Sequence, residues 1–205
     1  MTNRDQDLQY FIDACFAAFD QTVSDPEGRR SIAEIFRLLA LLGEQREGGG
    51  TRMPACVHLH NALHVSPATE SLRRTLDAFR AIEPKITWRR REDTTGTASE
   101  NFNDGHANGM IIGPGGIELR SDVWLGVTLM APKTRYPDHT HAPEETYLVM
   151  SEGEFQHGES SWFSPGVGGT FYNPPGIWHA MRSVEKPLLA FWALRPCTGR
   201  ANSTD

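Results

Sequence analysis

The chain has 205 residues, of which 39% are hydrophobic and 22% are charged, with a formal net charge of −6. This length and composition predict one soluble globular domain, and the acidic balance argues against a nucleic-acid partner, because phosphate binding needs a basic surface. The three cysteines show no disulfide framework, no apolar run reaches the roughly 18 residues of a membrane span, and no secretion signal opens the chain, so we expect a cytoplasmic protein with no membrane partner.

The N-terminal part predicts a series of helices. Apolar residues recur at helical spacing within the first twenty positions. A second helix is predicted to begin at Ser31, where Glu34 completes a capping box, and to end at Gly43, after which a flexible break follows. A third helix is expected over about 54–64, and a fourth from Pro67 onward.

Beyond residue 84 the pattern changes to short, alternating segments separated by glycine and proline. Such spacing predicts an antiparallel sandwich or barrel. The candidate strands are KITWRR, GMIIG, GIELR, DVWLGVTLMA, ETYLVMS, GEFQHG, SSWFS, GTFYN, WHAMRSV and PLLAFWAL. The basic run WRRRE over 88–92 is interpreted as a solvated strand edge. We therefore expect residues 1–84 to form a helical extension that packs on a β domain over residues 85–205.

The segment PDHTHAPEETY, which begins at Pro137, brings candidate metal ligands close together. His139 and His141 lie two positions apart, as do Glu145 and Tyr147, so in extended backbone each pair points to one face. Imidazole nitrogens and a carboxylate suit zinc, iron, manganese, nickel or cobalt. The HxH pair alone is weak, because it arises by chance roughly 0.3 times in a chain with 8 histidines.

Two further histidine segments differ in how well they support a metal site. HLHNALH contains His58, His60 and His64, but we expect a helix there, in which positions two apart diverge, and no carboxylate accompanies them. By contrast, GGTFYNPPGIWH delivers His179 to the start of a strand after a tight NPPG turn. Its glycine, proline and histidine pattern arises by chance only roughly 0.004 times, so a third imidazole from a separate strand is predicted.

Residues from about 85 to 195 resemble a cupin. The first cupin motif, G-x5-H-x-H-x3,4-E-x6-G, is matched at His139, His141 and Glu145, and the second, G-x5-P-x-G-x2-H-x3-N, is matched through His179. The resemblance implies a mainly β, double-stranded β-helix (jelly-roll) barrel with the N-terminal helices outside it. It also implies one divalent transition metal ion per chain, held by these four residues.

The chain departs from the two cupin motifs at three positions. Lys133 stands where the first motif begins with glycine, and Gly153 comes one residue later than that motif requires. Ser183 replaces the final asparagine of the second motif. None of the three is a metal ligand in these motifs, so the expected site is unaffected.

A narrower resemblance is to the bacterial cupin dimethylsulfoniopropionate (DMSP) lyases, the DddL/DddQ/DddW group. It rests on H-x-H-x3-E-x-Y, a tyrosine just upstream, a Trp-His pair, the strand PLLAFWALR and the helical extension. Those enzymes cleave a small zwitterionic sulfonium carboxylate to dimethyl sulfide and acrylate. The resemblance implies that Tyr147 is the general base and that Tyr136 is a second active-site tyrosine.

The sulfonium end of such a substrate donates no hydrogen bond and favours aromatic faces. The aromatic candidates for this part of the pocket are Trp124, Trp178, Trp192, Phe171 and Tyr136. A divalent ion close to the tyrosine base would favour its ionised form.

Two alternatives to a lyase stay open on the sequence alone. One is another cupin metalloenzyme such as an iron dioxygenase, in which Tyr147 has no necessary role. The other is a non-catalytic, metal-binding cupin sensor whose helical extension docks a partner. The resemblance to cupins also allows a homodimer.

Overall fold

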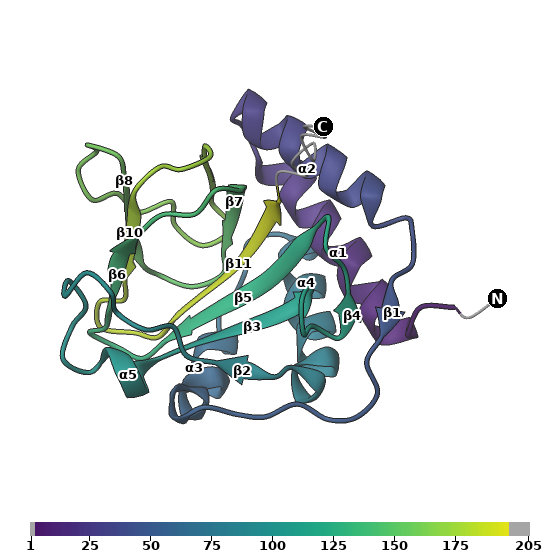
Figure 1. Ribbon diagram of the computed structural model, residues 1–205, viewed down its shortest axis with the longest axis horizontal. Coiled ribbons are helices and arrows are strands. Elements are labelled where there is room, and N and C mark those ends of the chain that lie inside the picture. Colours follow the sequence, from purple (N-terminus) through teal and green to yellow (C-terminus); the bar gives the residue numbers. More distant parts are fainter. Residues whose placement is uncertain (1–2, 197–205) are drawn as a thin grey trace, which may run out of the picture.

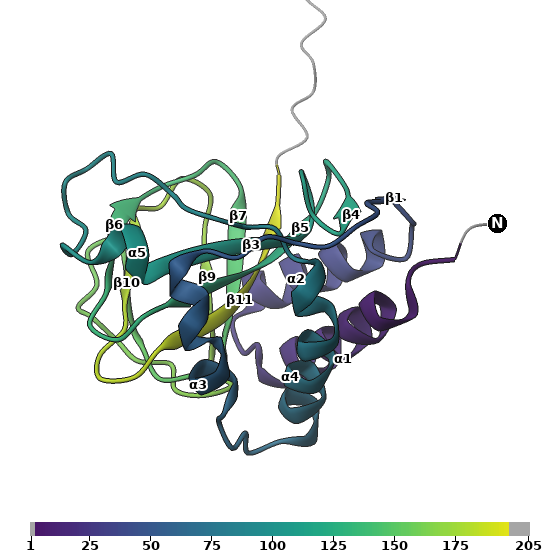
Figure 2. The same ribbon diagram turned by 90° about the horizontal axis from the view of Figure 1, so that it is seen from below.

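The computed structural model describes residues 3–196, so the predicted domain end at residue 205 lies outside the described residues. Two β-sheets face each other, and helices gather on the outer side of the larger sheet (Figures 1 and 2). The helices are α1 (Gln6–Thr22), α2 (Pro26–Leu38), α3 (Leu59–Leu63), α4 (Glu70–Ile82) and α5 (Phe102–Gly105), with 3₁₀ turns at Pro54–His58 and Glu83–Lys85. Among the described residues, none of the helices combines the length and apolar character that crossing a bilayer demands.

The strands belong to two sheets. They are β1 (Glu44–Gln45), β2 (Trp88–Arg89), β3 (His106–Ile112), β4 (Glu118–Leu119), β5 (Trp124–Met130), β6 (Arg135–His139), β7 (Glu144–Val149), β8 (Glu154–His157), β9 (Thr170–Asn173), β10 (His179–Arg182) and β11 (Leu188–Arg195). The larger sheet has the order β1-β4-β3-β5-β11-β7-β9, with β2 beside β3, and the smaller has the order β6-β10-β8. Neighbouring strands are antiparallel except β3 and β4.

The strand predictions differ from the structure in three places, one of which is β6, which no candidate segment contained. All the candidate segments contain strand except SSWFS, where only an isolated bridge joins Phe163 to Phe155. The break after Gly43 is not wholly irregular, because it contains β1, which pairs with β4. SSWFS and this break both lie at the edge of a sheet, where pairing depends on the partner strand rather than on local sequence.

The second helix begins earlier than predicted, so the capping box at Ser31 was wrong. Asp25 is the N-cap, and its side chain accepts a 2.8 Å hydrogen bond from the backbone N–H three residues on. Pro26 then takes the first helical position, where no N–H is needed. Ser31 is a buried interior residue, and the helix ends at Leu38. Similarly, α4 begins three residues after Pro67.

The larger sheet is buried on both faces. Along β5, Leu125, Val127 and Leu129 join the apolar cluster that contains the helices. The alternate positions, including Trp124 and Met130, face a second cluster inside the barrel. Helices α1, α2 and α4 lie on one side of this sheet, and the smaller sheet lies on the other (Figures 1 and 2). Burial on both faces explains why β5 and β11 are nearly continuous apolar runs.

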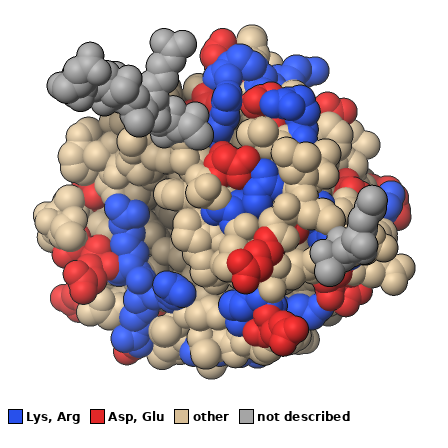
Figure 3. Space-filling model, turned by 45° about the vertical axis from the view of Figure 1, so that its right-hand side comes forward, with Lys and Arg blue, Asp and Glu red and all other residues tan. Residues whose placement is uncertain are grey.

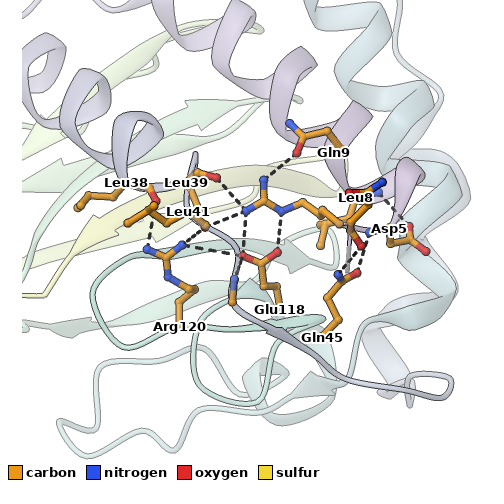
Figure 4. A network of polar contacts seen from close by, with 12 residues as sticks. Asp5, Leu8, Gln9, Leu38, Leu39, Leu41, Gln45, Glu118 and Arg120 are labelled. Atoms are coloured by element: carbon orange, nitrogen blue, oxygen red, sulfur yellow. Dashed lines mark hydrogen bonds and ion pairs between the residues drawn. The ribbon is translucent and has the colours of Figure 1, made fainter. Parts of the chain in front are cut away.

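A buried ion pair ties the N-terminal segment to the barrel (Figure 4). The Arg4 guanidinium donates to both Glu118 carboxylate oxygens, at 2.6 and 2.9 Å, and to the carbonyls of Leu39 and Leu41. Arg120 lies 3.9 Å from the same carboxylate and also donates to the Leu41 carbonyl. Glu118 is fully buried, so this network joins the chain before α1, the loop after α2 and β4.

Surface charges are mostly intermingled. Figure 3 shows acidic and basic side chains interspersed on the face that it presents. On the helices, several form pairs three positions apart, such as Glu34 with Arg37 and Glu70 with Arg73. Exposed pairs of this kind contribute little to stability, so the helices are held mainly by their apolar faces.

Candidate metal centre

Three histidines and a glutamate converge inside the barrel. His139 ends β6, His141 lies in the turn that follows, Glu145 is in β7 and His179 opens β10. His139 and His179 are opposite each other in the β6–β10 register, and their ring centroids lie 4.0 Å apart. The ligand nitrogens of the three histidines all lie within 4.8 Å of one another. Oε2 of Glu145 lies 3.3 Å from Nε2 of His141 and 3.3 Å from Nε2 of His179.

Backbone carbonyls fix the tautomer of each histidine. The Nδ1 atoms of His139, His141 and His179 lie 2.9, 2.9 and 3.0 Å from the carbonyl oxygens of Pro137, Pro143 and Ile177, respectively. A carbonyl oxygen can only accept, so each Nδ1 carries the proton. Each Nε2 therefore presents a lone pair to the space between the three rings, which is the form of histidine that binds a metal.

These lone pairs meet one another and a carboxylate with no donor between them. Nε2 of His179 is buried and has no hydrogen-bond partner among the described residues. The 3.3 Å separation between His141 Nε2 and Glu145 Oε2 is likewise a contact between two acceptors. Acceptors this close repel unless a cation lies among them. The residues present thus fit one divalent transition metal ion, and the donor set accepts zinc, iron, manganese, nickel or cobalt.

The protonation of two of the four side chains, Glu145 and His139, also suits a metal. Burial raises the pKa of the Glu145 carboxyl, but His141 and His179 outweigh burial and hold that pKa well below its usual range. Burial, followed by the charges of His179 and Arg91, lowers the pKa of His139 to about 3. Glu145 is therefore an anion and His139 is neutral near pH 7, and both are ready to bind a metal without first losing a proton.

Tyr147 lies beside the proposed ligands in β7. It is two residues beyond Glu145, so both side chains point to the same face. Its ring is 3% exposed and stacks on Phe171, with centroids 4.9 Å apart and planes at 13°. Burial, together with the Glu145 carboxylate, raises the pKa of Tyr147 well above its ordinary value. A base at this position therefore depends on a positive charge in the cavity to become ionised.

Tyr136 reaches the same cavity from β6. Its ring centroid lies 5.0 Å from that of His139, and its hydroxyl oxygen accepts a 2.8 Å hydrogen bond from Asn108 Nδ2. Burial raises the pKa of Tyr136 to about 12, although Arg91 and Asn108 act in the opposite direction. Both predicted active-site tyrosines are thus brought to one cavity.

The cavity holds only part of the predicted aromatic set. It has a volume of about 310 Å³, and Trp124 and Trp192 line it together with the two tyrosines. Phe171 does not line it, because its ring lies behind Tyr147. Trp178 is 54% exposed and does not line it either, contrary to the prediction. It directly precedes His179 at the start of β10, and successive residues in extended backbone point to opposite faces.

Some lining residues were missed by sequence reasoning. Asn108 in β3 and Thr128 in β5 are paired in register and both line the cavity. A threonine inside an otherwise apolar strand was a signal for the second of them. Arg89 and Arg91 also line the cavity, so the basic run at 88–92 is not only a solvated strand edge.

The other histidine group lies apart from this centre. His60 and His64 stack with ring centroids 5.6 Å apart near α3. Within residues 3–196, the only grouping of three or more potential metal ligands is that of His139, His141 and His179. The helical interpretation of HLHNALH thus agrees with the structure.

Comparisons with known proteins give a consistent result. The family model for dimethylsulfoniopropionate lyase matches residues 27–190. A curated Cereibacter sphaeroides protein, provisionally named dimethylsulfoniopropionate lyase DddL, is 26% identical over 152 residues, which are 73% of this chain and 62% of that protein. The match therefore spans less than two thirds of the relative's length.

Solved structures support the fold. The DMSP lyase DddQ from Ruegeria pomeroyi has a TM-score of 0.70 at 23% identity, covering 98% of this chain and 95% of that one. A chain from the crystal structures of the DMSP lyases RdDddP and RnDddQII has a TM-score of 0.69 at 23% identity, covering 97% and 95%. The predicted fold, a mainly β cupin barrel with an N-terminal helical extension, is confirmed.

Proposed function

The chain belongs to the dimethylsulfoniopropionate lyase family, and we propose that it is a metal-dependent carbon–sulfur lyase that cleaves DMSP to dimethyl sulfide and acrylate. The observation that supports this proposal best is the convergence of three Nε2 lone pairs and one carboxylate beside a cavity that two tyrosines line. In this proposal His139, His141, Glu145 and His179 hold one divalent ion.

The reaction we propose is a β-elimination. A proton leaves the carbon next to the carboxylate, its electron pair forms the new C=C bond, and the C–S bond breaks as neutral dimethyl sulfide departs. A divalent ion held by the four ligands would supply positive charge beside the carboxylate, which makes that C–H bond more acidic. Tyr147 accepts the proton on its phenolate oxygen, because it faces the cavity from the strand that carries Glu145.

The two ends of the substrate need different surroundings. A sulfonium group is a cation without hydrogen-bond donors, so it is stabilised by aromatic faces. Trp124 and Trp192 supply such faces on the β5 and β11 side of the cavity. We propose that the carboxylate lies beside the divalent ion, with the α-carbon turned toward Tyr147.

A headspace assay tests the proposal directly. Purified protein incubated with DMSP should release dimethyl sulfide, lose that activity after treatment with a chelator, and regain it when zinc, iron, manganese, nickel or cobalt is added back. If protein loaded with each of these metals in turn releases no dimethyl sulfide, the proposed reaction is wrong. If protein shown to be metal-free remains fully active, the metal dependence is wrong.

A further inference from the structure

Four side chains form a continuous hydrogen-bonded chain along the wall of the cavity. Trp192 Nε1 donates to Thr128 Oγ1 at 3.1 Å, and Thr128 Oγ1 donates to Asn108 Oδ1 at 2.7 Å. Asn108 Nδ2 then donates to the Tyr136 hydroxyl oxygen at 2.8 Å. The chain starts in β11, passes through β5 and β3, and ends in β6, so it links the two sheets.

Close packing against Gly126 brings the Trp192 indole within hydrogen-bonding distance of Thr128. A Cβ atom on Gly126 would lie 2.2 Å from the Trp192 ring, so only glycine at this position lets the indole lie across β5. Thr128 is 2% exposed and Trp192 is 9% exposed, so water does not readily replace the bond between them.

Each bond in the chain has a definite donor and acceptor. An indole N–H can only donate, so the Thr128 oxygen accepts from Trp192. The Thr128 hydroxyl donates its own proton to the Asn108 carbonyl oxygen. This bond orients the amide, because only its carbonyl oxygen can accept the Thr128 proton. The NH₂ group of Asn108 therefore faces Tyr136, whose oxygen accepts.

The proton of the Tyr136 hydroxyl must then point elsewhere. It cannot return along the chain, because Asn108 presents a donor. Arg91, whose charge counteracts the effect of burial on the pKa of Tyr136, is another group that only donates. Tyr136 lines the cavity with its ring beside that of His139, and the open direction is the cavity itself.

We infer that Asn108 is a positioning residue that, through its bond to Thr128, turns the Tyr136 hydroxyl into the cavity as a hydrogen-bond donor to a bound carboxylate. The identity of that carboxylate as the substrate's rests on the proposed function. Tyr136 would then recognise the anionic end of the substrate, and not the sulfonium end for which its aromatic ring was a candidate.

A double-mutant cycle measured by acrylate binding tests this inference. The probe is acrylate titrated calorimetrically into zinc-loaded protein, with equal zinc content checked for each variant. Tyr136→Phe should weaken binding roughly tenfold to a hundredfold, as expected for one hydrogen bond to a charged group. Asn108→Leu should produce most of the same loss, and the double variant should bind no more weakly than Tyr136→Phe alone.

Variants at Thr128 provide a second test that leaves Asn108 in place. Thr128→Val removes the hydroxyl that orients the amide and should weaken acrylate binding, whereas Thr128→Ser keeps the hydroxyl and should preserve binding. These two variants decide the question if Asn108→Leu does not fold. Additive losses in the cycle, unchanged binding in Asn108→Leu, equal binding in the two Thr128 variants, or no acrylate binding by the wild type would each overturn the inference.

The inference and the proposed function fail in different ways. Acrylate binding requires no turnover, so a protein that shows the coupling but releases no dimethyl sulfide from DMSP supports the inference and contradicts the proposed function. A protein that releases dimethyl sulfide but shows additive losses of acrylate binding in the cycle supports the proposed function and contradicts the inference.

Discussion

Replacing Tyr147 with phenylalanine tests the proposed base most directly. The substitution keeps the ring that stacks on Phe171 at 4.9 Å and contacts Phe155 at 5.8 Å, and it removes only the hydroxyl. Glu145 keeps its neighbouring histidines in the variant. The free energy of unfolding should therefore change by no more than about 1 kcal/mol.

The effect on turnover should be far larger. A general base accelerates proton transfer by roughly 10²–10⁴-fold, so Tyr147→Phe should lower kcat by at least about a hundredfold. The loss should appear in kcat more than in KM, because the hydroxyl acts on the transition state and not on substrate binding. Since burial and Glu145 raise the pKa of Tyr147, activity should increase with pH as the tyrosinate forms, and this limb should shift when the bound metal is exchanged.

The assay is dimethyl sulfide release at saturating DMSP from variants with verified metal content. Tyr172→Phe is a matched control, because Tyr172 donates a 2.8 Å hydrogen bond to Glu144 and lies outside the cavity. It removes a phenol hydroxyl beside a glutamate just as Tyr147→Phe does, yet it should leave turnover unchanged. If metal-loaded Tyr147→Phe keeps more than about a tenth of the wild-type kcat, the assignment of Tyr147 as the base is wrong.

Three further predictions concern stability. Glu118→Gln leaves the Arg4 guanidinium buried without its anion and should lower the free energy of unfolding by about 3–5 kcal/mol in urea titrations; a loss below about 1 kcal/mol would contradict this. Metal-free protein should become less stable as pH falls from about 6.5 toward 3, by up to about 1.4 kcal/mol per pH unit. The reason is that the folded pKa of His139 is about 3, so the unfolded chain binds this proton at higher pH than the folded protein does. Below about pH 4 the lowered pKa of Glu145 adds to the loss of stability. Constant stability over that range in thermal melts would refute the second. Lys133→Gly should be about 1 kcal/mol more stable than Lys133→Ala, because only glycine adopts a φ of 57° without strain, and equal stability would refute the third.

The proposed metal ligands could be predicted because their positions depend on local geometry. His139 and His141 share a face through a two-residue spacing, and Glu145 begins the next strand. A tight turn before His179 brings it to the register position opposite His139. Spacing along one chain therefore determined most of the arrangement, and only the pairing of β6 with β10 had to be supplied by the fold.

The rest of the cavity could not be read in this way. Asn108 and Thr128 meet because β3 and β5 pair in one particular register, and no local pattern sets that register. At the start of α2 the sequence held two competing capping signals, Asp25 with Pro26 and Ser31 with Glu34, and the helix uses the first. Residues whose role depends on a partner from another strand or helix are the ones that sequence reasoning missed.

The departures from the cupin motifs show why a motif can vary while its site persists. Lys133 replaces the motif's first glycine yet keeps a left-handed backbone, with φ 57°, and its N–H donates to the Val184 carbonyl at 2.8 Å. Ser183, in place of the motif's final asparagine, accepts from Thr134 N at 3.0 Å and donates to the Ala131 carbonyl. Both residues hydrogen-bond within the region where the chain enters β6 and leaves β10. More than one type of side chain can adopt the backbone conformation or make the hydrogen bonds that this region requires. The ligand positions have no such freedom, because no other side chain supplies an imidazole nitrogen or a carboxylate at the same point.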